Sequence, residues 1–277
     1  MKQLSITFLI LLFSTFSFAE NVKLKGKIGG KYGIEMELEK SADKENPIGG
    51  KYNYSGKTAF LTLKGMMYSD NIIYLEEFNS KGKHTGTFYL EWEEGKWKGI
   101  WTGNERHFDV LLEVISGDTD QFREFDFAKL NKGCNSNITG SYANDYYFLN
   151  DMWLHETGGM EVGFNGGVVS VEEIHKDTIK VQFELMCGPT YHVAFFDGYA
   201  VKKGKNMYEF NQSLYGDTDA CHLIFTFKDK KVSIDQKSSS MDCEFGARAY
   251  ADGEFQKINN KAKFGETVGI DDVLEMK

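Results

Sequence analysis

The stretch GTFYLEWEEGKWKGIWTG, residues 86–103, decides the fold class of this chain. Phe88, Leu90 and Trp92 recur at every second position, which is the spacing that places side chains on one face of a β-strand. The chain then turns at residues 94–95 and resumes with two more tryptophans. The stretch therefore predicts an antiparallel hairpin with one apolar face.

The same alternation recurs on both sides of this hairpin. We expect eight strands in the first part of the chain, near residues 22–28, 31–39, 48–54, 58–65, 71–78, 84–92, 96–102 and 106–115. A series of hairpins hides its edge strands most simply by closing into a barrel. Residues 20–115 are therefore predicted to form an eight-stranded antiparallel β-barrel.

The second part of the chain resumes the strand pattern after a connector, residues 116–133, in which the alternation is lost. Nine further strands are expected, near residues 138–148, 159–164, 167–174, 178–186, 190–201, 206–213, 221–228, 231–236 and 245–256. We predict a disulfide-containing barrel over residues 134–257 and a polar tail over residues 258–277. The expected fold class is all-β with two tandem antiparallel, calycin-like β-barrels, and a single merged sandwich is the alternative.

The first residues, MKQLSITFLILLFSTFSFA (1–19), have the pattern of a cleaved secretory signal peptide. Lys2 precedes an apolar stretch, and the small residues Ser17 and Ala19 mark its end. A transmembrane anchor is the alternative, but the apolar core is shorter than the roughly 20 residues that cross a bilayer. We therefore expect a periplasmic or secreted protein without a stable membrane anchor.

The four cysteines, Cys134, Cys187, Cys221 and Cys243, all lie in the second part of the chain. In an oxidising compartment an even set of cysteines is usually paired, and four cysteines allow three pairings. A structural zinc site normally includes a C-x2-C pair, which this spacing lacks. The six histidines show no H-x-x-x-H spacing. We therefore expect no metal and no cofactor.

Two further classes of function are disfavoured by residue type and charge. The chain has no G-x-S-x-G nucleophile elbow, and its paired glutamates are adjacent, so on a strand they point to opposite faces. We therefore expect a protein that is not an enzyme. The net charge of -9 disfavours binding to nucleic acid, which needs basic patches. The acidic excess lies in residues 116–277, with 26 Asp and Glu against 17 Lys and Arg.

Two segments resemble known bacterial families. Residues 26–115, with IGGKYGIEMELE, LEEFNSKGKHTGTFYLEW and GKWKGIWT, resemble a small secreted bacterial β-barrel module. Residues 221–257, CHLIFTFKDKKVSIDQKSSSMDCEFGARAYADGEFQK, resemble a segment of envelope proteins that carry LprI-type lysozyme inhibitor regions, although Glu244 stands where that pattern has Gly. The second resemblance implies that Cys221 pairs with Cys243, which leaves Cys134 to pair with Cys187.

A cluster of aromatic and acidic residues in YANDYYFLNDMWLHETGGMEV is the candidate binding site. Aromatic side chains rimmed by acids suit a hot spot for a protein partner, whereas the alternative places the same rings in the barrel core. The candidate residues are Tyr146, Tyr147, Asp151, Trp153, His155 and Glu156. The hypothesis is a non-enzymatic inhibitor or immunity protein whose partner is a basic, envelope-targeted hydrolase or toxin. The alternatives are a calycin-like carrier of a small apolar ligand and a structural envelope protein.

Overall fold

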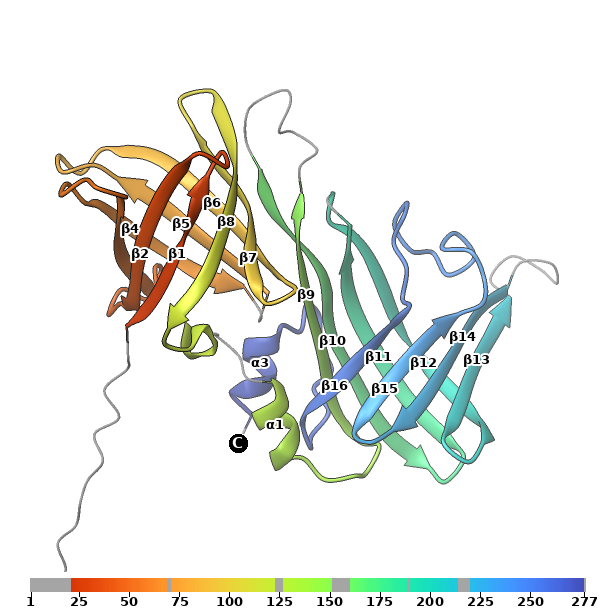
Figure 1. Ribbon diagram of the computed structural model, residues 1–277. Helices are drawn as coiled ribbons and strands as arrows, with labels where there is room; N and C mark the ends of the chain where they lie inside the picture. Colours follow the sequence, from red (N-terminus) through yellow and green to blue (C-terminus); the bar gives the residue numbers. More distant parts are fainter. Residues whose placement is uncertain are drawn as a thin grey trace, which may run out of the picture.

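Two closed antiparallel β-barrels of eight strands each make up this protein in a computed structural model (Figure 1). The structure describes residues 21–68, 71–122, 127–150, 160–188, 190–213 and 220–276. The barrels lie side by side and follow one another along the chain (Figure 1). This confirms the predicted fold class, and the alternative of one merged sandwich is wrong.

In the first barrel each strand hydrogen-bonds its neighbour in sequence, and β1 pairs with β8 to close the sheet. The strands are β1 (Val22–Ile28), β2 (Tyr32–Lys40), β3 (Ile48–Tyr54), β4 (Leu61–Tyr68), β5 (Ile72–Phe78), β6 (His84–Glu93), β7 (Lys96–Gly103) and β8 (Arg106–Ser116). The hairpin read first in the sequence is β6–β7, in which Trp92 pairs with Trp97. The largest fully buried side chains of the first barrel are Trp97, Tyr52 and Phe88.

The core of the first barrel also contains a carboxylate. Glu77 is 4% exposed, and its oxygens accept hydrogen bonds from Tyr52 Oη at 2.5 Å, Thr85 Oγ1 at 2.5 Å and Trp101 Nε1 at 2.9 Å. Burial and the neighbouring Glu77 carboxylate raise the pKa of Tyr52 far above its ordinary value. A buried carboxylate with three donors is satisfied, so this group has a structural role within the barrel.

The connector between the barrels carries two short helices. The 3-10 helix η1 (Thr119–Phe122) inserts Phe122 into the core of the first barrel. Helix α1 (Phe127–Gly133) and the C-terminal helix α3 (Ile270–Leu274) lie below the junction (Figure 1). They cover the outer face of the second barrel, where the fully buried Val273 of α3 packs with Ala143 and Ile258.

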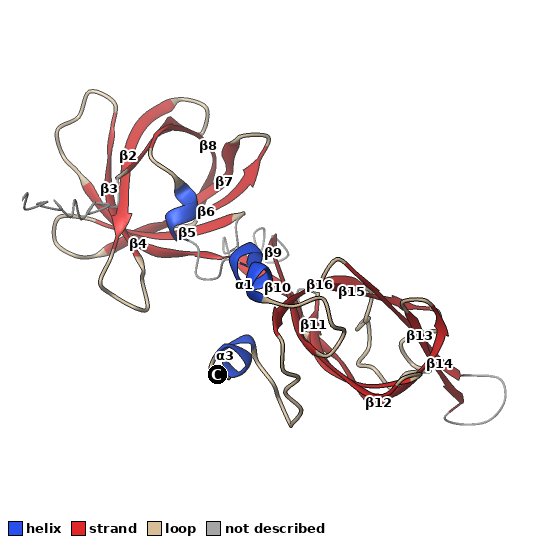
Figure 2. Cartoon of the chain, turned by 90° about the horizontal axis from the view of Figure 1, so that it is seen from below, coloured by secondary structure: helices blue, strands red, loops and turns tan. Residues whose placement is uncertain are grey.

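The second barrel has the strand order β10-β11-β12-β13-β14-β15-β16-β9, and β9 and β10 pair to close it. The strands are β9 (Gly140–Asn150), β10 (Glu161–His175), β11 (Thr178–Cys187), β12 (His192–Gly204), β13 (Met207–Ser213), β14 (Ala220–Lys228), β15 (Lys231–Gln236) and β16 (Gly253–Asn259). We call the end at which β9 finishes the upper end and the end at which it begins the lower end. In Figure 2 the barrels are viewed from the lower end.

Eight strands replace the nine expected in this part of the chain. The two runs expected near 159–164 and 167–174 are the single strand β10, because Gly166 and Gly167 lie within the strand and do not form a turn. A Cβ on Gly166 would lie 2.1 Å from the carbonyl oxygen of Asn144, so this close approach requires glycine. The last expected strand begins later than expected, at Gly253. Residues 237–252, which we call the strap, connect β15 to β16 at the upper end.

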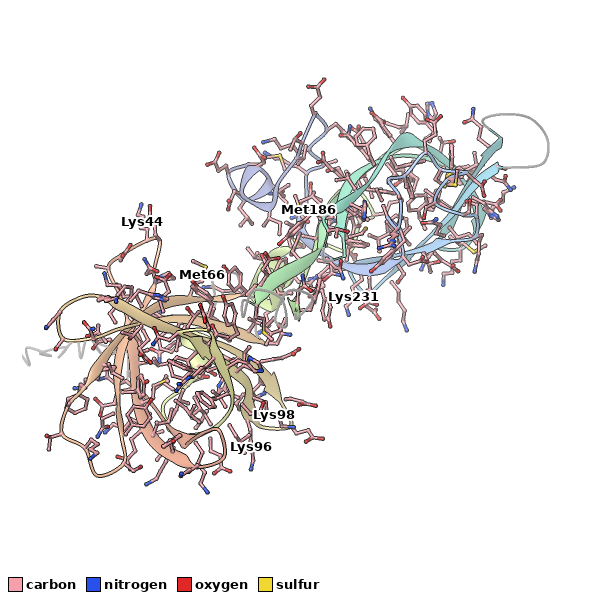
Figure 3. All side chains as sticks on the ribbon, turned by 90° about the horizontal axis from the view of Figure 1, so that it is seen from above. Lys44, Met66, Lys96, Lys98, Met186 and Lys231 are labelled. Atoms are coloured by element: carbon pink, nitrogen blue, oxygen red, sulfur yellow. A yellow bond between two sulfur atoms is a disulfide. The ribbon has the colours of Figure 1, made fainter. Side chains whose placement is uncertain are left out.

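Large apolar side chains fill the interior of the second barrel, as in the first (Figure 3). The largest that are fully buried are Tyr142, Phe183, Phe225 and Phe255. The strap adds Phe245, whose ring packs edge-on against Phe183 with centroids 6.0 Å apart. Among the described residues, no helix has the length and apolar composition needed to cross a membrane.

One expected disulfide is present and the other is not. Cys221 and Cys243 are bonded, whereas Cys134 and Cys187 are free and buried, so the expected pairing of these two is wrong. Cys134 follows α1 at the lower end, and Cys187 ends β11 at the upper end. The ten residues of β11 extend about 33 Å, whereas a disulfide needs Cα atoms about 4.4–6.8 Å apart.

Candidate functional site

The two described residues of the candidate site, Tyr146 and Tyr147, are neighbours on β9 and therefore point to opposite faces of the sheet. Tyr147 faces outward, where its ring lies 5.1 Å from that of Tyr68 in the first barrel and 4.9 Å from that of Phe164. Its carbonyl accepts a hydrogen bond from the Asn71 amide at 3.5 Å. Tyr147 therefore belongs to the contact between the two barrels.

Tyr146 points to the inner face of the upper part of β9. Its ring stacks on Phe148 with centroids 6.3 Å apart, yet the residue is 51% exposed. On the inner face, Asn165 lies directly across from Tyr146 on β10. The other four candidates, Asp151, Trp153, His155 and Glu156, lie outside the described residues.

Three further large side chains are exposed at the same end of the barrel. Tyr191 lies in the turn between β11 and β12 and is 47% exposed, while Met241 and Tyr250 of the strap are 82% and 42% exposed. Burial raises the pKa of Tyr250, and the neighbouring Cys187, Asp252 and Tyr146 raise it further. We call Tyr146, Tyr191, Met241 and Tyr250 the aromatic rim. Tyr191 and Tyr250 fall within the runs 190–201 and 245–256 that the sequence predicted as strands, and Met241 lies between two predicted strands. The pattern therefore gave no reason to place the three together.

The strap that carries half of the rim is held at several points. The Cys221–Cys243 disulfide joins it to β14, and Phe245 anchors it in the barrel core. The backbone N–H of Gly246 donates to the carbonyl of Val193 at 3.0 Å, which fastens the strap to the edge of β12. These attachments fix the strap to the end of the barrel.

Tyr191 is held in an unusual backbone conformation. Its φ is +52°, in the left-handed region, which costs a non-glycine residue about 1–2 kcal/mol. Its hydroxyl donates to the carbonyl of Val162 on β10 at 3.3 Å, so the ring bridges two strands at the upper end. Eight other non-glycine residues among those described also have a positive φ, most of them in turns, so this conformation belongs to the β11–β12 turn.

Apolar side chains continue from the rim down the outer face of β12. Val193, Phe195, Tyr199 and Val201 alternate outward and are each between 36% and 58% exposed. Met186 of β11, 42% exposed, lies directly across from Val193. Asp197 points outward between Phe195 and Tyr199 and pairs with Lys180, so it divides this row into two short apolar stretches.

Charge divides between the two ends of the second barrel. The described charged residues at the upper end are mainly acidic: Glu161, Asp235, Asp242, Glu244 and Asp252, with Lys237 and Arg248 as the bases. Lys237 forms an ion pair with Asp235. The hairpin turns of the lower end and the strand residues beside them carry the acids Glu172, Glu173, Asp177 and Asp229 and a larger number of lysines: Lys176, Lys202, Lys203, Lys205, Lys228, Lys230 and Lys231. The aromatic rim is therefore set in the acidic end.

No cluster of metal-ligating side chains accompanies the rim in the part of the chain that the structure describes. Across those residues, His, Cys, Asp and Glu side chains form no group of three or more that could hold a metal ion. Comparison of this chain with protein-family models, with curated proteins and with solved structures finds no match.

Proposed function

We propose that this chain is a non-enzymatic binding protein, exported to the periplasm or beyond, which recognises a protein partner through the aromatic rim of its second barrel. The observation that carries the proposal is the set of four large side chains, Tyr146, Tyr191, Met241 and Tyr250, left between 42% and 82% exposed at one end of a barrel. Tyrosine supplies large contact area at a low cost in conformational entropy, so it is common at binding hot spots.

The charge of the rim's surroundings points to a basic partner. Asp242, Glu244 and Asp252 of the strap, together with Glu161, create a negative field at the upper end. Such a field accelerates association with a positively charged protein, and salt screens it. A lysozyme-like hydrolase or a basic, envelope-targeted toxin fits this description, so the protein would act as an inhibitor or an immunity protein.

The packing of the barrels favours a surface site over an interior one. In each barrel the inward-facing positions of the described strands hold large, fully buried side chains, Trp97 and Phe88 in the first and Phe183 and Phe225 in the second. A carrier of a small apolar ligand needs a lined cavity of several hundred Å³ inside the barrel. The filled interiors therefore support the binding protein over the calycin-like carrier.

The test is binding of the exported chain to purified basic hydrolases, beginning with lysozymes, in a series of salt concentrations. We expect wild-type binding to weaken as salt increases, and the Tyr146→Ala/Tyr250→Ala variant to bind about tenfold or more weakly. The matched control is Tyr32→Ala/Phe60→Ala, which removes two aromatic rings of similar exposure from the first barrel.

Candidate partners outside the lysozymes come from mass spectrometry of envelope proteins that co-purify with the exported chain. Each captured protein is purified and measured against the same two variants. Equal affinity of the rim variant and the control variant for every partner would contradict the proposed site.

A further inference from the structure

The lower end of the second barrel contains a pocket that the proposed function does not use. Its volume is about 530 Å³, which lies within the range of about 300–1,000 Å³ that is usual for small-molecule sites. It opens between the segment after α1 and the β14–β15 turn, at the end of the barrel that faces the viewer in Figure 2. The lining residues come from the segment 131–142, from Asn206 and from residues 227–231.

A buried lysine lies directly behind the wall of this pocket. Lys257 of β16 is 0% exposed, and its Nζ donates to the carbonyl of Asn137 at 2.6 Å and to Asn135 Oδ1 at 3.0 Å. It also lies 5.9 Å from the centroid of the Tyr142 ring. Both Asn137 and Tyr142 line the pocket, so the Lys257 ammonium is in contact with two residues of the pocket wall.

Lys257 lacks a carboxylate partner among the described residues, where its contacts are neutral oxygens and an aromatic ring. A buried charge is normally paired, because removing it from water without a counter-charge costs several kcal/mol. Burial lowers the pKa of Lys257, the neighbouring Cys134 opposes this shift, and the nearby ammonium of Lys230 lowers the pKa further. An anion in the pocket would supply the missing negative charge.

The pocket wall adds more positive charge than negative. Lys228 makes no side-chain hydrogen bond or ion pair with any described residue, so its ammonium is free to meet a ligand. Lys230 donates to the carbonyl of Asn131 at 3.1 Å, and Lys231 pairs with Glu254 at 2.5 Å. Asp229 is the one carboxylate among the lining residues.

Neutral polar groups complete the lining. Among the described residues, the side chains of Ser136, Asn137 and Asn206 make no hydrogen bond, and all three are exposed to the pocket mouth. Beneath them Tyr142 and Phe227 form an apolar floor, and the Tyr142 hydroxyl is already used by the carbonyl of Ile138 at 2.6 Å. Free amides and a hydroxyl above an apolar floor suit a ligand with several hydroxyl groups.

We propose that this pocket binds an anionic sugar unit, with the phosphate or carboxylate near Lys228 and Lys230 and the hydroxyl groups against Ser136, Asn137 and Asn206. The site is separate from the aromatic rim, which lies at the opposite end of the barrel, so occupancy here does not depend on the protein partner proposed above.

The test measures binding of four probes to the full exported chain by titration calorimetry: glucose 6-phosphate, glucuronate, glucose and inorganic phosphate. We expect the two charged sugars to bind more tightly than glucose, which lacks the anionic group. They should also bind more tightly than inorganic phosphate, which lacks the sugar hydroxyl groups. A preference between the two charged sugars distinguishes a phosphate from a carboxylate. Equal binding of glucose, or binding of none of the four, would overturn the proposal.

Variants locate the binding. Lys228→Gln/Lys230→Gln should weaken binding of the charged sugar by about tenfold or more, the equivalent of about 1.4 kcal/mol. Lys228→Gln alone, which breaks no contact of the fold, should weaken it in the same direction. The control is Lys81→Gln/Lys83→Gln, an equal loss of charge at the same spacing in a turn of the first barrel. If the control variant weakens binding as much as the pocket variant, the effect comes from the change in net charge and the proposed site is refuted.

Discussion

The disulfide that fastens the strap provides the most direct test of how the second barrel is built. Cys221 and Cys243 are separated by 22 residues in sequence. Closing a loop of that size in the unfolded chain accounts for about 3.4 kcal/mol at 25 °C in the chain-entropy treatment. The double variant Cys221→Ala/Cys243→Ala should therefore lower the free energy of unfolding of the second barrel by about 3 kcal/mol and leave the first barrel unchanged.

Urea unfolding followed with two probes separates the barrels. Three of the four tryptophans, Trp92, Trp97 and Trp101, lie in the first barrel, so in a Trp153→Phe background fluorescence reports that barrel alone. Far-UV circular dichroism reports both. With an m-value of about 2 kcal/mol/M, the loss corresponds to a midpoint about 1.5 M lower for the second barrel.

Reduction of the wild-type disulfide provides the control for this experiment. A reducing agent should lower the midpoint of the wild type to that of the double variant and leave the variant unchanged. Binding through the aromatic rim should also weaken, because Met241 and Tyr250 lose one attachment of the strap. The reasoning is refuted if the dichroism midpoint falls by less than about 0.5 M, or if the fluorescence transition moves with it.

Three further outcomes follow from single side chains. Glu77→Gln removes the charge that accepts three buried hydrogen bonds, so the fluorescence-detected stability of the first barrel should fall by about 3 kcal/mol; a loss below about 1 kcal/mol would contradict the network. Tyr191→Gly relieves a left-handed φ, so stability should stay within about 1 kcal/mol while partner binding weakens; unchanged binding would remove Tyr191 from the site. Lys257→Met tests the lowered pKa. Between that pKa and the unfolded value of about 10.4 the unfolded state binds more protons, so wild-type stability should rise with pH relative to the variant in denaturation at stepped pH. A difference independent of pH would contradict this assignment.

The fold class could be predicted because the side chains of a β-strand alternate between its two faces, and this alternation is visible in the sequence. In the β6–β7 hairpin, alternate residues face the core, and Glu94 and Gly95 take the positive φ values that a tight hairpin turn requires. The same period-two pattern led to the eight strands of the first barrel. It failed at Gly166-Gly167, because a glycine that permits close backbone approach within β10 has the same sequence appearance as a turn.

Three of the four rim residues were not predictable from the sequence. The sequence grouped Tyr146 and Tyr147 as neighbours, whereas the pleat of β9 sends one ring to the rim and the other to the contact with the first barrel. Tyr191, Met241 and Tyr250 join Tyr146 only because the turns between alternate strands meet at one end of a closed barrel. Their separation along the chain gives no indication of this.

The sequence alone therefore determined the local structure: strands, hairpins and the partition into two barrels follow from alternation and turn residues, which act over a few neighbouring positions. Only the tertiary structure decided which distant residues meet. Barrel closure places Cys134 and Cys187 at opposite ends, gathers lysines at the lower end, and puts Lys257 behind a pocket without a carboxylate partner among the described residues. These juxtapositions depend on strand order and register, which are set by long-range pairing across the whole sheet.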